Sequence, residues 1–471
     1  MDLYEGLTRE SPSGETLPAA AKSWQVSTDG KDYTFTLRPH LQWSNGEPLR
    51  ASDFLRSWRR VLDPQGRSPT AENLKIIRGA QEIIAGRAAP DTLGVEAPAD
   101  GTLIVHLARP APYFPGLLSH PVTFPVYSET AARTHEPKEF VSNGPFVFAH
   151  WQPGTVIRLS RNGAYWDRAT LSIAEVDYQI SSDENVQYAR FRAGELDLTD
   201  TVPSNALAEL KQQSPSPVVI APYLATAYYV LNLNLPTLGR NAKLRRALAL
   251  AIDRKRVVAM LGSGQEPAHS FLPPGVWSYH PQTVDWASLD DQSRVEEAKR
   301  LYREAGYSDA TALQLRVLIN SNVAIRRTAV LIAAMWKEVL GVESQITEEE
   351  YRVFLQSRQD KSRWDVVRLG WVADFNDASN FLEGFRSDSV NNNSGYSNPS
   401  FDRLLDEAAT TTDPKKRAEL LESAERTLLE DGPIIPLYTL VSKHLVKPYV
   451  QGVSPSPLGR LSSKDLGLTA H

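Results

Sequence analysis

Cysteine is entirely absent from this chain of 471 residues, which also holds only three methionines and nine dispersed histidines. The lack of cysteine excludes disulfides, thiolate nucleophiles and cysteine-based metal sites. So few histidines give no support to a metal site built from protein ligands. The sequence therefore predicts neither a metal nor another cofactor.

Long hydrophobic runs and an excess of one charge are also missing. No apolar stretch approaches the roughly 20 residues that a membrane-spanning helix needs, so we expect no direct membrane insertion. Lys+Arg of 51 against Asp+Glu of 56 gives a net charge of −5, which offers no electrostatic case for nucleic acid. The first residues, from Met1 to Gly6, lack the basic and apolar regions of a signal peptide.

Common enzyme motifs are missing as well. There is no Gly-x-Ser-x-Gly elbow and no phosphate-binding loop, and Gly262-Ser263-Gly264 lacks the third glycine of a dinucleotide fingerprint. His135-Glu136 has no second histidine at helical spacing, which excludes a zinc-protease motif. A glycosidase stays open, because its two carboxylates can lie far apart in sequence.

The length indicates two or three domains, because one compact core does not grow this large. In the first third, residues 32–38 and 102–107 alternate as half-buried strands do. Asn45-Gly46 predicts a turn, and Ser52 is the expected N-cap of a helix over residues 53–62. Further on, the pattern predicts strands at 143–148, 155–159, 175–180 and 196–198, with a helix through 188–191.

Beyond Asn241 the pattern becomes mainly helical. Helices are predicted over residues 243–261, 293–305 and 325–339, with a strand at 313–319 between them, as in an α/β lobe with buried strands. A late strand opening at 433–438 could return to the earlier lobe. Two such crossover strands would form a hinge, so that the lobes close on a ligand.

Chemistry is most concentrated at Arg368-Leu369-Gly370-Trp371-Val372-Ala373-Asp374-Phe375, where an apolar-rich strand ends. A guanidinium, an indole and a carboxylate at one spot suit a ligand with an amine, a carboxylate and peptide groups. Three structural alternatives stay open: Asp374 as a helix N-cap or Asx turn, Arg368 as the partner of a nearby carboxylate, and Trp371 as core packing.

A series of motifs in a fixed order carries a family resemblance. The chain resembles the periplasmic oligopeptide-binding proteins of ABC importers, solute-binding family 5 of the peptide/nickel-binding superfamily, from Leu3 to about Val450. The motifs are Tyr4-Glu5-Gly6-Leu7, Trp43-Ser44-Asn45-Gly46, Ser57-Trp58-Arg59-Arg60-Val61-Leu62-Asp63-Pro64, Ser142-Asn143-Gly144-Pro145-Phe146, Arg161-Asn162-Gly163-Ala164-Tyr165-Trp166, Arg192-Ala193-Gly194-Glu195-Leu196-Asp197 and Leu244-Arg245-Arg246-Ala247-Leu248-Ala249-Leu250-Ala251-Ile252-Asp253-Arg254.

The resemblance implies an α/β, two-lobe, three-domain periplasmic-binding-protein fold (type II, Venus flytrap) with hinge crossover strands. Domain I would comprise residues 1–6, 130–225 and 442–471, domain II residues 7–129, and domain III residues 226–441. Family members carry roughly forty mature residues before the Tyr-Glu-Gly-Leu motif, including the first strand of domain I. The resemblance therefore implies that this N-terminal strand is missing, which would leave an exposed sheet edge.

The resemblance also assigns roles to residues near the cluster. Asp374 matches the aspartate that holds a peptide's α-ammonium, and Gly370 and Trp371 match the strand that pairs with the peptide backbone. Arg368 and Arg358 match basic residues that receive the charged C-terminal end of some ligands. Main-chain pairing is the same for every peptide, which explains tolerance of sequence.

Pocket positions show both matches and departures. Tyr351 aligns with an aromatic residue of a side-chain pocket, and Asn320 with a polar pocket residue. Asp200, with Thr201 beside it, replaces a pocket tyrosine of the family. Ile325 replaces a histidine that meets the C-terminus of longer peptides, although the adjacent Arg326 could substitute.

Four further positions differ from the family pattern. Thr70 and Leu440 stand where the family has tyrosines. The frequent disulfide of the family would join positions Ala225 and Val372, and both cysteines are lost together. Loss of the pair suggests a tolerated structural change.

The sequence thus predicts a non-enzymatic receptor that captures short peptides between its lobes for import, working as a monomer with the membrane permease subunits of an ABC importer. The resemblance implies a periplasmic or extracytoplasmic location. An alternative keeps the fold but binds a dedicated ligand, such as a modified peptide, a metal chelate or an oligosaccharide. An enzyme or a non-transport interaction protein is the third class.

Overall fold

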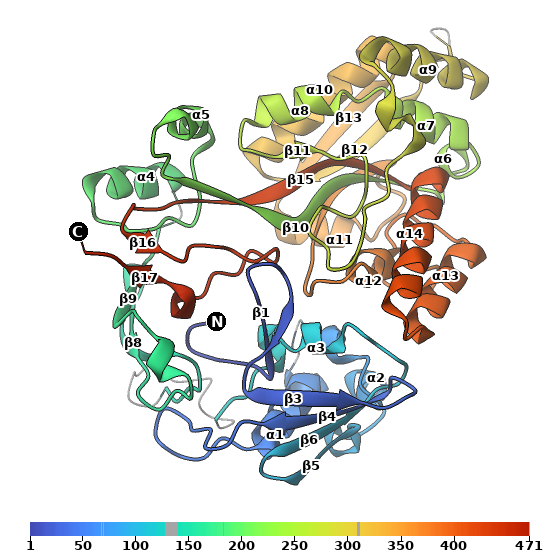
Figure 1. Ribbon diagram of the computed structural model, residues 1–471. Helices are drawn as coiled ribbons and strands as arrows, with labels where there is room; N and C mark the ends of the chain where they lie inside the picture. The colour runs from blue at the N-terminus through green and yellow to red at the C-terminus, as the bar shows by residue number, and fades with distance from the viewer. Residues whose placement is uncertain (67, 69, 128–139, 182, 309–310, 471) are drawn as a thin grey trace.

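The computed structural model describes residues 1–66, 68, 70–127, 140–181, 183–308 and 311–470. The chain forms two lobes, shown below and above one another in Figure 1. Lobe 1 carries a four-stranded and a three-stranded sheet, and lobe 2 carries a six-stranded sheet. The pair His135-Glu136 and the expected domain boundary at 129–130 lie outside the described residues.

The four-stranded sheet of lobe 1 has the order β3-β4-β6-β5 (Ala21–Val26, Asp32–Leu37, Thr102–His106 and Val95–Ala99), with every neighbouring pair antiparallel. Helix α1 (Ala51–Leu62) supplies Phe54 and Trp58 to the core that Phe35 of β4 enters, and all three side chains are fully buried. The two strands predicted here are confirmed. A small hairpin of β1 (Thr8–Glu10) and β2 (Thr16–Pro18) precedes this sheet.

The N-cap expected at Ser52 is wrong. Helix α1 begins at Ala51, and its N-cap residue is Arg50. Asp53, at the third helical position, accepts the Arg50 main-chain N–H at 2.8 Å. An acidic side chain reaching back in this way satisfies an end donor of the helix, so the helix starts earlier than a serine cap predicts.

The three-stranded sheet of lobe 1 joins β7 (Phe146–Gln152), β8 (Val156–Arg161) and β9 (Glu175–Gln179) in antiparallel order, as predicted. Helices α4 (Glu184–Ala193) and α5 (Ser204–Gln212) follow it. The strand expected at 196–198 is wrong, because only an isolated bridge between Leu198 and Val446 forms there.

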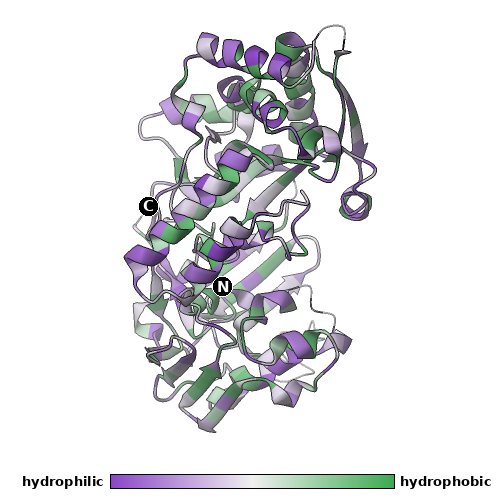
Figure 2. Cartoon of the chain, turned by 90° about the vertical axis from the view of Figure 1, so that its right-hand side faces the viewer, coloured by the Kyte–Doolittle hydropathy of each residue, from purple (hydrophilic) through white to green (hydrophobic). Residues whose placement is uncertain are grey.

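Lobe 2 is built on one mixed sheet with helices around it. Its order is β11-β15-β10-β14-β12-β13, with bounds Glu266–Pro267, Ile434–Leu445, Val218–Leu231, Val366–Val372, Gln314–Asn320 and Glu343–Glu349. Strand β12 is parallel to β13 and β14, whereas β10 is antiparallel to β14 and β15. The longer helices are α9 (Asp291–Glu304), α10 (Val323–Leu340), α13 (Pro399–Thr410) and α14 (Pro414–Asp431). Figure 2 shows hydrophilic and hydrophobic residues interspersed along the surface helices.

The single helix expected over 243–261 is wrong. Two helices form instead, α7 (Ala242–Leu250) and α8 (Arg254–Leu261). Asp253 lies between them in an extended conformation, and its side chain accepts the Arg256 N–H at 3.0 Å. A good N-cap residue therefore starts a new helix inside a run of helical apolar spacing.

Strands β10 and β15 run from the region of α4 and α5 into lobe 2 (Figure 1). They pair from Val218–Leu445 at one end to Val230–Ile434 at the other, with an irregularity between Pro222 and Thr226. This is the predicted return of the chain between lobes. Ala225 lies directly opposite Val372 of β14, as the absent disulfide of the family required.

Candidate functional site

Strand β14 has one edge paired and the other partly open. Along its whole length it pairs with β10, from Val366–Leu231 to Val372–Ala225. On the other side, β12 pairs only with Val366 and Val367. In the described part of the chain no strand covers the remaining edge, so an extended peptide can add to it by main-chain hydrogen bonds.

The side chains of β14 leave this edge accessible. Gly370 is exposed, and an added Cβ would lie 3.6 Å from Nη1 of Arg368, an ordinary contact. Trp371 is partly buried against the lobe 2 core and donates its indole N–H to Oδ1 of Asn380 at 2.9 Å. The indole is thus packed and hydrogen-bonded beside the strand end, in line with the core-packing alternative, and its contact with a ligand stays a prediction.

Arg368 has no carboxylate within ion-pair distance among the described residues. Its guanidinium makes one long hydrogen bond, 3.4 Å to the hydroxyl of Tyr438. No described carboxylate therefore takes Arg368 as a structural partner. The charge remains available to an anionic group from outside the chain.

Arg358 is the second cation expected at the site. It follows helix α11 (Tyr351–Ser357), and in the described part of the chain its buried Nε has no hydrogen-bond partner. Burial raises the pKa of the Tyr228 hydroxyl, and the charges of Arg358 and Arg368 both act to lower it. A guanidinium offers two parallel donors to a carboxylate, so either arginine could receive one.

Asp374 lies two residues beyond the end of β14 with 39 % of its side chain exposed. Burial raises the pKa of this carboxyl, while the charge of Arg460 and a hydrogen bond from Asn380 oppose the rise. In the described chain no arginine or lysine lies within 4.0 Å of the carboxylate, and its ion-pair contact is His120 Nε2 at 3.9 Å. The carboxylate therefore lacks a direct permanent cation.

The histidine does not supply that cation near neutral pH. Nδ1 of His120 accepts the main-chain N–H of Val122 at 3.2 Å, which leaves the proton of the neutral ring on Nε2. Burial, together with the charge of Arg460, lowers the pKa of His120 to about 4. The ring is neutral above that pH and faces the carboxylate as a weak donor.

The two structural alternatives for Asp374, a helix N-cap and an Asx turn, are wrong. The short helix α12 (Ser379–Leu382) is preceded by Ala378, not by Asp374. The Asx-type contact belongs to Asp377, whose Oδ1 accepts the Ser379 N–H at 2.9 Å. The carboxylate of Asp374 is thus not used to end or begin an element.

Tyr351 and Asn320 lie at the same end of the lobe 2 sheet as the last residues of β14. Asn320 ends β12, and Tyr351 opens α11 just after β13, with 57 % of its side chain exposed. Because β12, β13 and β14 are parallel, their carboxyl ends meet there, the usual place for a ligand on such a sheet.

Asp200 and Thr201 lie elsewhere. The neighbouring Thr199 donates its N–H to Leu445 O at 3.0 Å, at the lobe 1 end of β15. Leu445 lies about 23 Å along β15 from Tyr438, the residue that contacts Arg368, because each of the seven residue steps between them adds about 3.3 Å. No hydrogen bond or ion pair joins Asp200 or Thr201 to the other expected site residues in the described chain.

The structure also places the residues discussed for longer ligands and two tryptophans of the family motifs. Ile325 is buried in the lobe 2 core, and Arg326 lies 3.6 Å from Glu348, so that its charge is partly engaged. Trp43 and Trp58, which belong to the family motifs, are fully buried core residues.

The segment after β14 contacts lobe 1. The ring of Phe375 stacks on Tyr113 with centroids 4.7 Å apart, and Asn376 donates to Gly14 O at 3.3 Å. Nearby, Arg109 pairs with Glu383 at 3.1 Å. A cavity of about 350 Å³ begins at Asn376 and is lined from both lobes.

Four residues around Asp374 were not found from the sequence: His120, Asn380, Arg460 and Ser119. Arg460 and Asp374 are 86 residues apart, and no local pattern joins them. In the described residues no group of three or more His, Asp or Glu side chains could hold a metal. None of the helices described combines the length and apolar character that crossing a bilayer requires.

The model of the bacterial extracellular solute-binding proteins, family 5, matches residues 15–393, which is most of the chain. The chain belongs to this family. Members are substrate-binding proteins of transporters, and the two-lobe α/β fold expected from the resemblance is confirmed by the structures below.

One similar family 5 relative is the periplasmic oligopeptide-binding protein OppA of Salmonella typhimurium, 36 % identical over 100 % of this chain and 88 % of the relative. Among solved structures, an unliganded open form of MppA, a periplasmic murein tripeptide binding protein, has a TM-score of 0.87 at 32 % identity, covering 100 % of this chain and 92 % of the other. Haemophilus influenzae OppA in complex with RPPGFSPFR has a TM-score of 0.80 at 33 % identity, covering 99 % and 93 %.

Proposed function

We propose that this protein is the solute-binding receptor of an ABC importer and captures short peptides between its lobes. The observation that carries the proposal is the arrangement around β14. In the described chain an open strand edge has at one end a carboxylate with no arginine or lysine partner, and two guanidiniums have no carboxylate partners. A peptide has the matching order of ammonium, main chain and carboxylate. Periplasmic relatives named for peptide binding support the same assignment.

In this proposal Asp374 holds the α-ammonium, and the edge of β14 at Gly370 and Trp371 pairs with the peptide main chain. Arg368 and Arg358 receive the terminal carboxylate of ligands short enough to end there. Excluding water from these ion pairs strengthens them, and a ligand without matching charges would leave buried charges unpaired. Through these contacts the protein selects a peptide by its charged ends and not by its side chains.

Other residues complete the proposal. Tyr351 and Asn320 line a side-chain pocket at the sheet edge, and Asp200 and Thr201 face the ligand from lobe 1 when the lobes close. Domain I comprises residues 1–6, 130–225 and 442–471, domain II residues 7–129, and domain III residues 226–441. The protein works as a monomer outside the cytoplasm, without catalysis, and presents its closed form to the permease subunits.

Native mass spectrometry of freshly purified protein tests the cargo. We expect a set of bound masses that sequence as short peptides with free amino ends. A single bound species of another chemistry, such as a chelate or an oligosaccharide, would instead establish a dedicated ligand. As a control, the D374N protein purified in parallel should carry less of the same peptides.

A further inference from the structure

We propose that Arg460 is a positioning residue for the amine anchor: it holds Asp374 by the main chain and leaves the carboxylate free for a ligand's ammonium. The inference rests on the proposed function, since it concerns how Asp374 meets a peptide. It adds a specificity-determining residue that lies outside β14 and on the far side of the lobe junction.

The guanidinium of Arg460 bridges the two lobes through main-chain oxygens. Nη1 donates to Ser119 O at 2.9 Å and to Ser119 Oγ at 2.8 Å. Nη2 donates to the carbonyl oxygen of Asp374 at 3.1 Å. Ser119 belongs to lobe 1 and Asp374 to lobe 2, so one planar group spans the junction beside the anchor.

The donors of Arg460 are thus directed at neutral oxygens. In the described chain the nitrogens of Arg460 do not come within 4.0 Å of the Asp374 carboxylate. The ion-pair contact of that carboxylate is with His120. A direct bidentate pair would have neutralised the carboxylate and excluded an ammonium. The observed geometry keeps a positive charge near the anchor without occupying it.

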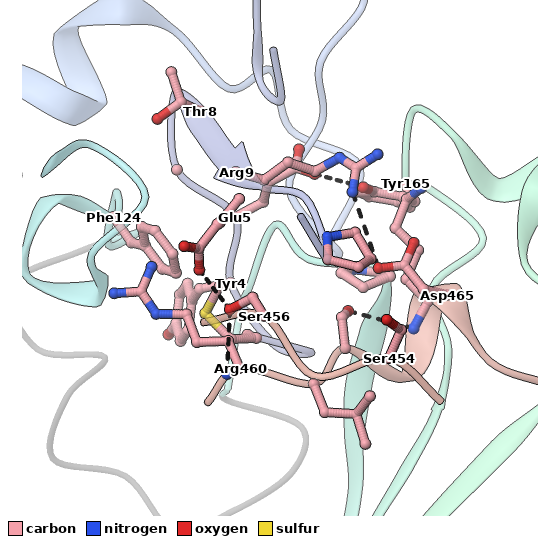
Figure 3. Close-up of a pocket in the computed structure, with 18 residues that line it drawn as sticks. Tyr4, Glu5, Thr8, Arg9, Phe124, Tyr165, Ser454, Ser456, Arg460 and Asp465 are labelled. Atoms are coloured by element: carbon pink, nitrogen blue, oxygen red, sulfur yellow. Dashed lines mark hydrogen bonds and ion pairs between the residues drawn. The ribbon is translucent and has the colours of Figure 1, made fainter. Parts of the chain in front are cut away.

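Arg460 is itself held firmly. Its carbonyl accepts the N–H of Ser456 at 2.9 Å, and its N–H reaches Ser456 Oγ at 3.4 Å. That hydroxyl donates to the carboxylate of Glu10. Figure 3 shows Arg460 and Ser456 together at the wall of a cavity that Tyr4 and Phe124 also line. The loop therefore holds the main chain from which the guanidinium extends.

The main chain of Asp374 is held at both of its polar groups. Its carbonyl accepts from Arg460, and its N–H donates to Asn380 Oδ1 at 3.3 Å. The next residue, Phe375, stacks on Tyr113 of lobe 1. With the peptide group fixed, few orientations remain for the carboxylate, and pre-organisation of this kind lowers the entropic cost of binding.

Charge acts in the same direction. Burial raises the pKa of Asp374, and Arg460 is the charged group that opposes the rise. His120 faces the carboxylate directly, while Glu10, Tyr223 and the α-amine of Met1 face Arg460. Arg460 therefore helps to keep Asp374 ionised, which an ammonium requires.

A competing role makes the opposite prediction. If the main effect of Arg460 were instead to repel a ligand's ammonium, its removal would strengthen binding of free peptides. A positioning role predicts that removal weakens them. The sign of the change therefore decides between the two.

Calorimetry with trialanine and N-acetyl-trialanine measures this sign as a preference, the ratio of the two affinities. We expect R460M to lower the preference at least about tenfold, with the affinity for the acetylated peptide little changed. R460K keeps the charge but has one nitrogen in place of the two that bond separately to Ser119 and Asp374, so it should also lose preference. An unchanged or increased preference in both variants would overturn the proposal.

A matched control is Arg56, which also donates to main-chain oxygens, those of Val126 and Tyr127, each at 2.8 Å. R56M should leave the preference unchanged, which separates a specific effect from loss of an arginine–carbonyl contact. If the unmodified protein shows no preference at all, the amine anchor itself fails. If it shows a preference that R460M retains, the role of Arg460 alone fails.

The pH profile gives a readout that general loosening of the fold would not move. As the pH falls, protonation of Asp374 abolishes the preference for the free peptide. In R460M this loss should begin at a higher pH, because Arg460 no longer opposes the rise that burial causes in the pKa of Asp374. His120 titrates nearby, with its pKa at about 4, so both profiles are measured in an H120N background. A midpoint that does not shift would contradict the charge part of the proposal.

Discussion

Replacing Asp374 by asparagine is expected to weaken binding of a free tripeptide about 10- to 150-fold, because a charge-assisted hydrogen bond of about 1.5–3 kcal/mol is lost. Asparagine has nearly the same shape, and the main-chain contacts of residue 374 with Arg460 and Asn380 do not need the carboxylate. The substitution therefore removes the charge and little else. Calorimetry with trialanine measures the loss.

N-acetyl-trialanine supplies the internal control, because it has no ammonium to lose. Its affinity should be nearly the same for the D374N variant and the unmodified protein. A second control is D388N, which removes a carboxylate that is 81 % exposed on the same lobe. If D374N weakened both peptides equally, the residue would be structural and the amine-anchor role would be lost.

The second large effect concerns stability. Arg417 and Asp377 form a buried, two-point ion pair at 2.7 and 2.8 Å, with side chains 12 % and 9 % exposed. D377N would leave the guanidinium buried without its counter-ion, which costs about 3–5 kcal/mol. Lobe 2 of the variant should unfold at a clearly lower urea concentration.

An exposed pair that is also bidentate serves as the control. Arg158 and Asp177 also meet at two points, at 2.7 and 2.6 Å, but Arg158 is 46 % exposed. D177N should therefore cost less than about 1 kcal/mol. A double variant, D377N with R417M, should recover much of the stability, because it leaves no charge unpaired and asparagine can still accept the Ser379 N–H. Equal effects of D377N and D177N would contradict the importance of burial.

The same pair predicts a dependence on pH. Burial alone would raise the pKa of Asp377, but the charge and hydrogen bonds of Arg417 outweigh burial and lower that pKa. The unfolded chain, with an aspartate pKa near 3.9, then takes up the proton first as the pH falls. The stabilisation is complete above that pH and is lost below it, so acid unfolding should be less steep in D377N.

The sequence predicted the strands well wherever alternation was regular, as at β4, β6, β8 and β12. It was wrong where one polar side chain decided a boundary. Asp53 moved the start of α1, and Asp253 divided a helical run into α7 and α8. Such caps depend on a single hydrogen bond, which apolar periodicity does not register.

The central part of the site was predictable because it is local. Arg368, Gly370, Trp371 and Asp374 lie within seven residues, and strand β14 brings them to one edge. The surroundings of Asp374 were not predictable, since Arg460 and His120 come from distant segments. Only the packing of the two lobes shows that the nearest guanidinium is directed at a carbonyl and not at the carboxylate.

The most direct test of the account is calorimetry of the unmodified protein with trialanine and with N-acetyl-trialanine at neutral pH. A receptor that holds the peptide by its ammonium at Asp374 predicts that the free peptide binds at least about tenfold more tightly. Equal affinities, or tighter binding of the acetylated peptide, would contradict it.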